Sequence, residues 1–203
     1  MAGLREKNKT LREQRIVTAA EHLFLKNGYV DTRIEDIAAE AEVSVGTIYN
    51  YFQNKTDMLL RIVAQGDEAI ARELSELSAD PPADPIDYIS SVFEISTLRS
   101  MERLGRENWR HLLATSIIQQ DSDLGVRYLA LTERLKGRLR AALRDLEKQE
   151  KLQLGDNVDQ LAEILFLVEG SLYLKLISSD SWSFERYSRG LRDNLRFMLD
   201  WVK

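Results

Sequence analysis

Residues 43–59 read VSVGTIYNYFQNKTDML, and this stretch decides the fold of the N-terminal part of the chain. Ser44 is a favourable helix N-cap, because its hydroxyl can accept a hydrogen bond from a free amide of the next turn. Ile48 and Phe52 lie four residues apart on one helix face, which predicts that they contact a core. The outer surface is left to Val45, Thr47, Tyr49, Asn50 and Tyr51, and Gly46 with Thr47 keeps the first turn small enough for close approach to another backbone. The sequence therefore predicts a short helix with an apolar anchor and a polar, aromatic outer face.

A second helix is predicted just before it. Thr32 is a candidate N-cap, and Glu35, three residues on, completes the pattern of a capping box. The apolar stripe of this helix consists of Ile34, Ile37, Ala38 and Ala41. Only residues 42–44 separate the two helices, and small alanines permit close packing at a steep crossing angle, as in a helix-turn-helix.

A third helix precedes this pair and is expected to stop at Asn27-Gly28. Its helically spaced apolar residues are Ile16, Ala19, Ala20, Leu23 and Phe24. The three helices are predicted to share one small core. The outward groups of the last helix would then suit a DNA major groove, and its N-terminus would suit a phosphate.

From about Arg12 to Leu60 the chain resembles the TetR-type transcriptional regulators. The shared motifs are Ala-Ala-x-x-Leu-Phe…Gly-Tyr, Thr-x-x-x-Asp-Ile-Ala-x-x-Ala-x-Val-Ser and Gly-Thr-x-Tyr-x-Tyr-Phe-x-x-Lys-x-x-Leu-Leu. Thr56 departs from the pattern, since an acidic residue is more usual there. The resemblance implies an all-α protein, in which a helix-turn-helix head is joined to a larger ligand-binding and dimerisation bundle. We expect a DNA-binding domain at 1–56 and the connector helix and bundle at 57–203.

For the head, the expected partner is double-stranded operator DNA. Thr47, Tyr49, Asn50 and Tyr51 would supply groove and phosphate contacts, with Val45 and Gly46 on the same helix. Asn50 is a plausible base reader, because its amide can pair with adenine. The expected clamps on the DNA backbone are Thr32, Arg33, Ser44 and Lys55.

The charge of the chain is unevenly distributed. Residues 1–61 hold nine of the 28 basic and nine of the 33 acidic residues, so the net charge of −5 belongs entirely to residues 62–203. In the first 15 residues, five cations (Arg5, Lys7, Lys9, Arg12 and Arg15) face only Glu6 and Glu13. We expect a flexible basic arm there, which would follow a phosphate backbone or enter the minor groove. Taken alone, the same charges are also typical of a solvated terminus.

Beyond the head the sequence predicts a connector helix over 57–77, broken by Ser78–Pro85. Further helices are predicted at 86–101, 104–119, 123–150, 157–178 and 183–201, about nine in all. The last two helices carry apolar stripes: Leu161, Ile164, Leu165, Val168, Leu172 and Leu176, and then Leu191, Leu195, Met198 and Leu199. These stripes fit an intrachain core, or the homodimer interface through the last two helices that the resemblance implies.

A small-molecule effector of unknown identity is expected in the helical bundle. Its candidate residues are Trp109, Arg110, His111, Tyr128, Glu169 and Tyr173, aromatic and polar groups that could line a largely apolar pocket. Each of them could equally be an ordinary core or rim residue. Without an effector, the same head would suit a DNA-binding architectural or division-control protein. An interaction or enzyme domain that kept the head without DNA binding is a third interpretation.

Composition narrows the classes further. The chain has no cysteine, which excludes a disulfide framework and cysteine-based chemistry. His22 and His111 lie far apart in the sequence, and no phosphate-binding Gly-rich loop or metal-binding His-Glu-x-x-His motif occurs. We therefore expect no catalytic residues, no metal and no cofactor. No apolar run is long enough to span a membrane, so a cytoplasmic protein is expected.

Overall fold

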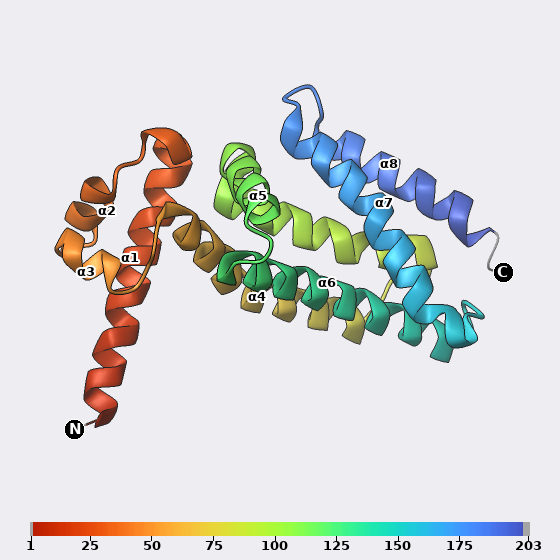
Figure 1. Cartoon of the computed structure of the whole chain (residues 1–203). Helices are drawn as coiled ribbons and strands as arrows, with labels where there is room; N and C mark the ends of the chain where they lie inside the picture. The colour runs from red at the N-terminus through yellow and green to blue at the C-terminus, as the bar shows by residue number, and fades with distance from the viewer. Residues whose placement is uncertain (1, 201–203) are drawn as a thin grey trace. The chain divides into compact units, whose positions relative to one another are not determined.

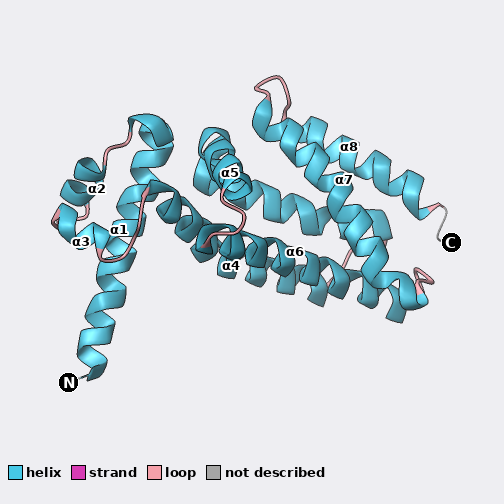
Figure 2. Ribbon diagram, viewed as in Figure 1, coloured by secondary structure: helices cyan, strands magenta, loops and turns pink. Residues whose placement is uncertain are grey.

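The computed structural model describes residues 2–200, with side chains from Glu6 onward. Within this range the chain is all α-helical and has no strand (Figures 1 and 2), which confirms the predicted fold class. The elements are α1 (Ala2–Asp31), α2 (Ile34–Glu40), α3 (Val45–Tyr49), α4 (Lys55–Ala79), α5 (Pro85–Ile118), α6 (Asp123–Lys148), the 3-10 turn η1 (Gly155–Asn157), α7 (Val158–Ser178) and α8 (Phe184–Leu199). The predicted connector corresponds to α4.

Glycines interrupt two of the longest helices. Gly28 in α1 has φ 80° and ψ 169°, and Gly105 in α5 has φ 70° and ψ 165°. Both pairs of angles lie in a region that essentially only glycine occupies. The predicted stop at Asn27-Gly28 is thus a kink, after which helical structure resumes up to Asp31. The helices predicted at 86–101 and 104–119 are the two halves of α5.

The prediction of a flexible N-terminal arm is wrong for the described residues, because α1 already begins at Ala2. The cause lies in composition: residues 4–15 consist largely of Leu, Arg, Glu, Lys and Gln, which are good helix formers, without proline or glycine. The Arg5 side chain lies outside the described residues.

The chain divides into two compact units. The first contains the chain up to Gly66 together with Met101–Tyr128, and the second contains Asp67–Ser100 together with the chain from Leu129 onward. The helices α4, α5 and α6 therefore each have residues in both units. The predicted boundary after residue 56 follows the helix-turn-helix motif and stays a prediction.

In the first unit, α1, α2, α3 and the start of α4 share the predicted core. Its fully buried side chains include Ile16, Phe24, Ile37, Ile48 and Met58. The second half of α5 also binds α1. Arg103 donates two hydrogen bonds to the Glu21 carboxylate, at 2.9 and 2.7 Å, and Asn108 Nδ2 donates to the Phe24 carbonyl at 3.0 Å.

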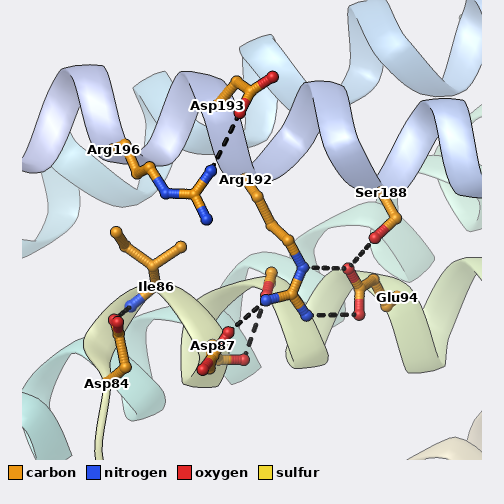
Figure 3. Close-up of polar contacts among 9 residues, drawn as sticks. Asp84, Ile86, Asp87, Glu94, Ser188, Arg192, Asp193 and Arg196 are labelled. Carbon is orange, nitrogen blue, oxygen red and sulfur yellow. Dashed lines mark hydrogen bonds and ion pairs between the residues drawn. The ribbon is translucent and has the colours of Figure 1, made fainter.

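In the second unit, α7 and α8 pack together, and polar contacts join α8 to the first half of α5. Arg192 of α8 donates to both carboxylate oxygens of Glu94, at 3.2 and 3.3 Å, and also pairs with Asp87 (Figure 3). The Ser188 hydroxyl donates to the same Glu94 at 2.6 Å. These contacts fix which face of α8 turns toward α5.

Most residues of the two predicted apolar stripes belong to this core. The buried members are Leu161, Leu165, Leu172 and Leu176 of α7, and Leu191, Leu195 and Leu199 of α8. An intrachain core therefore accounts for most of both stripes. Ile164 differs, since 43% of its surface is exposed.

Over the described range, every helix is either too short or too polar to cross a bilayer.

Candidate nucleic-acid interface

The short helix α3 has the predicted N-cap and anchor. The Thr47 amide donates to Ser44 Oγ at 3.1 Å, and the Ser44 and Thr47 hydroxyl oxygens lie 2.8 Å apart. Ile48 is fully buried and Phe52 is 4% exposed. The buried side chains of Ile48 and Phe52 thus anchor the helix to the core, and Ser44 caps its N-terminus.

The turn before α3 is held in one conformation. Glu42 has φ 51°, and the Val43 amide donates to the Ala38 carbonyl at 2.9 Å, a Schellman closure of α2. Arg15 of α1 donates to the Ala41 carbonyl at 2.6 Å and to the Glu42 carboxylate at 2.9 Å. Because these hydrogen bonds join α1, α2 and the turn, α3 has a defined direction relative to α1 and α2.

The outer face of α3 presents the groups that the sequence predicted. Tyr49 is 58% exposed, and Ser44, Gly46 and Asn50 are also exposed. The half-buried positions are Val45, Thr47 and Tyr51. The exposed set combines a phenol, an amide and a hydroxyl, all of which can hydrogen-bond to base edges or phosphates.

The prediction that Thr32 caps α2 is wrong. Its hydroxyl donates to the carbonyls of Gly28 at 2.7 Å and Leu23 at 3.1 Å, and the residue is 1% exposed. The N-cap of α2 is Arg33, without a side-chain cap, so the capping box with Glu35 does not form. The hydroxyl that would cap α2 is thus bonded to carbonyls of α1, and the predicted contact of Thr32 with the DNA backbone stays a prediction. Arg33 itself is exposed.

Lys55 has a structural role that the sequence did not reveal. Its ammonium group donates to the carbonyls of Tyr29, Val30 and Thr32, at 2.5, 3.3 and 2.9 Å, and lies 4.5 Å from the centre of the Tyr29 ring. Burial lowers the pKa of Lys55, and the charge of Asp31 opposes this shift. Lys55 thus joins the start of α4 to the end of α1, and its predicted phosphate contact stays a prediction.

Four of the predicted effector residues lie in the first unit. The His111 ring stacks on Tyr29 with 4.5 Å between ring centres, so His111 contacts the head. Trp109 is 6% exposed, Arg110 is exposed and Tyr128 is half-buried. The Tyr29 hydroxyl, 2.8 Å from Thr56 Oγ1, extends this contact to α4.

Glu169 and Tyr173 lie on α7 in the second unit. The Tyr187 hydroxyl donates to Glu169 Oε1 at 2.7 Å, and the Thr97 hydroxyl donates to the same oxygen at 3.4 Å. Burial raises the pKa of Glu169 to about 7, although both hydrogen bonds lower it. Burial also raises the pKa of Tyr187. The sequence did not predict Tyr187 and Thr97 as partners; the spacing of Tyr187 with Leu191 and Leu195 could have indicated that Tyr187 faces the core.

Two surface hollows have other linings than the predicted effector residues. One lies between α1 and the end of α2, and the other lies along α8 among Phe184, Ser188 and three arginines. Among the described residues, no three histidine, aspartate or glutamate side chains come together as metal ligands. The predicted effector residues thus stay a prediction.

The head of this chain is similar to that of known regulatory proteins. Residues 16–62 match the family model described as bacterial regulatory proteins, tetR family. The HTH-type transcriptional regulator TcmR of Streptomyces glaucescens is 27% identical over 158 residues, which cover 76% of this chain and 67% of TcmR.

Solved structures share the fold over nearly the whole length. A TetR-family transcriptional regulator from Mesorhizobium loti superposes with a TM-score of 0.72 at 20% identity, covering 95% of this chain and 96% of that one. Thermus thermophilus FadR, a TetR-family repressor in complex with lauroyl-CoA, gives a TM-score of 0.68 at 24% identity and 93% coverage of both chains. With the matched residues 16–62 and the capped α3, this chain carries the head of the tetR family of bacterial regulatory proteins, and it shares the fold of the solved TetR-family regulators.

Proposed function

We propose that this chain is a repressor that binds a partly palindromic operator as a homodimer and is released by a small-molecule effector. The observation that carries the proposal is α3, a rigid helix whose exposed face holds Tyr49 and Asn50. One short helix reads few base pairs, whereas a two-fold dimer places two such helices about 34 Å apart in successive major grooves. The proposal includes a cytoplasmic location and no catalytic activity.

Within this proposal, Thr47, Tyr49, Asn50 and Tyr51 contact the groove and its edges. Ser44, Arg33 and Lys55 contact backbone phosphates. The Lys55→Ala variant is a poor test of such a contact, because it also removes the bonds to the carbonyls of Tyr29, Val30 and Thr32.

The direct test uses duplexes that the protein selects from a random-sequence pool. Replacing Tyr49 and Asn50 together by alanine should weaken binding to the selected duplex by about 1–3 kcal/mol for each base that the protein no longer reads. Binding to an unselected duplex should hardly change. Fluorescence anisotropy measures both affinities; an equal loss on both duplexes would mean that these side chains only position the protein.

The effector part of the proposal has support from the fold, since the FadR structure contains lauroyl-CoA. An effector acts only through its different affinities for the DNA-binding and released forms, a coupling of about 1–3 kcal/mol in typical cases. A regulator without an effector is the second candidate, and the burial of Trp109 and Glu169 favours it. A thermal-shift screen of a metabolite library separates the two: a compound that raises the melting temperature and weakens operator binding supports the sensor.

A further inference from the structure

The N-terminal half of α1 carries cations that the head does not use. Lys7, Lys9 and Arg12 are exposed, and they form no ion pair with any side chain that the structure describes. Lys9 and Arg12 are three residues apart in a helix, so they lie on one face, about 4.5 Å apart along the axis.

The carboxylates that border this segment already have partners. Glu13 pairs with Arg61 at 2.6 Å, and Glu40 pairs with His22 at 2.8 Å. Glu42, as described above, pairs with Arg15. Glu6 also lies in this segment, so residues 6–12 hold three cations against one carboxylate, a net charge of +2 that is available to an anionic partner.

Beside Arg12 the surface is hollowed next to the helix-turn-helix. Most of its polar lining can donate hydrogen bonds: Asn8, Arg12, Gln14, Arg15 and Thr18 of α1, with Glu40 on the opposite side. Arg15 lies against the turn that leads into Ser44 and α3. A hollow with these donors, beside the predicted recognition helix, suits a phosphate group of the same duplex.

We propose that the N-terminal half of α1 binds DNA backbone phosphates as a rigid helix from outside the grooves, through Lys9, Arg12 and the hollow beside Arg15. The inference rests on the proposed function, because it adds phosphate contacts to the same operator complex. An α-helix is about 10–12 Å wide with its side chains, and the minor groove is about 6 Å wide. The segment therefore follows the phosphates and does not enter the minor groove.

The first experiment measures how the affinity for a random-sequence duplex depends on salt. Each phosphate contact contributes about 0.9 to the slope of log K against log salt concentration. Because both copies in the proposed homodimer carry the change, Lys9→Gln and Arg12→Gln should each lower this slope by about 1.8 and weaken binding to all sequences alike. Arg144→Gln is the matched control, since Arg144 is an exposed arginine of α6; it should leave the slope unchanged.

The second experiment tests rigidity without changing charge. Thr10→Pro breaks α1 before its first core residue, Ile16, and should lower the slope as Lys9→Gln does, whereas Thr10→Ala keeps both helix and slope. Melting curves establish that each variant is folded. If the wild type fails to bind any duplex, the proposed function fails. If it binds and Lys9→Gln and Arg12→Gln keep its slope, the phosphate contacts are refuted; if only Thr10→Pro keeps it, the segment acts as a flexible arm and the rigid helix is refuted.

Discussion

Two glutamates occupy backbone positions that favour glycine. Glu42 and Glu150 have φ 51° and 57°, and both follow the end of a helix. At the end of α6 the Lys151 amide donates to the Leu146 carbonyl at 2.9 Å, so Glu150 stands at the left-handed position of a Schellman closure. A side chain there costs about 1–2 kcal/mol, which the closure offsets.

Glu150→Gly should therefore raise the free energy of unfolding. The relief of left-handed strain exceeds the extra entropy that glycine gives to the unfolded chain, which leaves a gain of about 0.5–1 kcal/mol. Urea denaturation measures the change. Ala141→Gly, at an exposed position inside α6, is the control and should lower the stability by a similar amount; a loss in both variants would contradict the strain at Glu150.

Glu169 makes stability depend on pH. Its pKa is about 7 in the folded protein against an ordinary value of 4.5, so between these pH values the folded state keeps a proton that the unfolded state has released. The free energy of unfolding then falls as pH rises, and the total fall reaches about 3 kcal/mol above pH 7. Glu169→Gln should remove this fall, so that the variant is the more stable protein at pH 8 and has no such advantage at pH 4.5. Denaturation of both proteins across this range checks the difference; parallel curves would contradict it.

For single residues, the sequence predicts some roles and misses others, and the difference has a physical cause. The N-cap of Ser44 depends on residues within one turn, and it is confirmed. The bonds of Thr32 lead back to carbonyls of α1, and the bonds of Lys55 depend on how α4 meets α1. Such contacts need the tertiary structure.

At the scale of elements, the kinks at Gly28 and Gly105 interrupt the two longest helices, α1 and α5. At Gly105, an added Cβ would lie 3.7 Å from Leu25 Cδ2, an ordinary contact, so the backbone alone requires glycine there. At Gly28 the added atom would also lie 2.7 Å from Glu107 Oε1. The sequence located the break at Gly28, because glycine punctuates helical patterns. In α5 the predicted gap fell at residues 102–103, just before Gly105, and in neither helix could the sequence show that helical structure resumes at once on the far side.

Gly105→Ala should destabilise the protein by about 1–3 kcal/mol, the cost of holding a side chain in this backbone region. Gly137→Ala is the matched control in α6, where an added Cβ meets nothing within 4 Å. That change should stabilise the protein by about 0.5–1 kcal/mol, since alanine favours a helix. Chemical denaturation of both variants measures the change in the free energy of unfolding, which should be negative for Gly105→Ala and positive for Gly137→Ala. A stabilised Gly105→Ala variant would show that the kink is not required.

At the scale of the whole molecule, α7 and α8 have more apolar surface than their intrachain packing covers. Ile164, Leu167 and Leu174 of α7 are 43%, 63% and 50% exposed, and Phe197 of α8 is 69% exposed. The apolar stripes predicted from the sequence lie mainly in the core, so the stripe available to a partner is a different one, in which Leu167 and Leu174 replace Leu165 and Leu172. Periodicity alone could not separate two stripes on one helix that is apolar almost all round.

If a homodimer covers this second stripe, a single charge introduced into the stripe should disrupt the dimer. Leu167→Glu should convert the dimer into a folded monomer, because dimerisation would bury an unpaired carboxylate, which costs several kcal/mol. The monomer should also bind the operator more weakly, since only one copy of α3 would then contact the duplex. Ile118→Glu is the control, an 80% exposed apolar residue at the end of α5 that should leave the dimer intact. Sedimentation equilibrium measures the mass of each variant and circular dichroism its helicity; a dimeric Leu167→Glu variant would place the interface elsewhere.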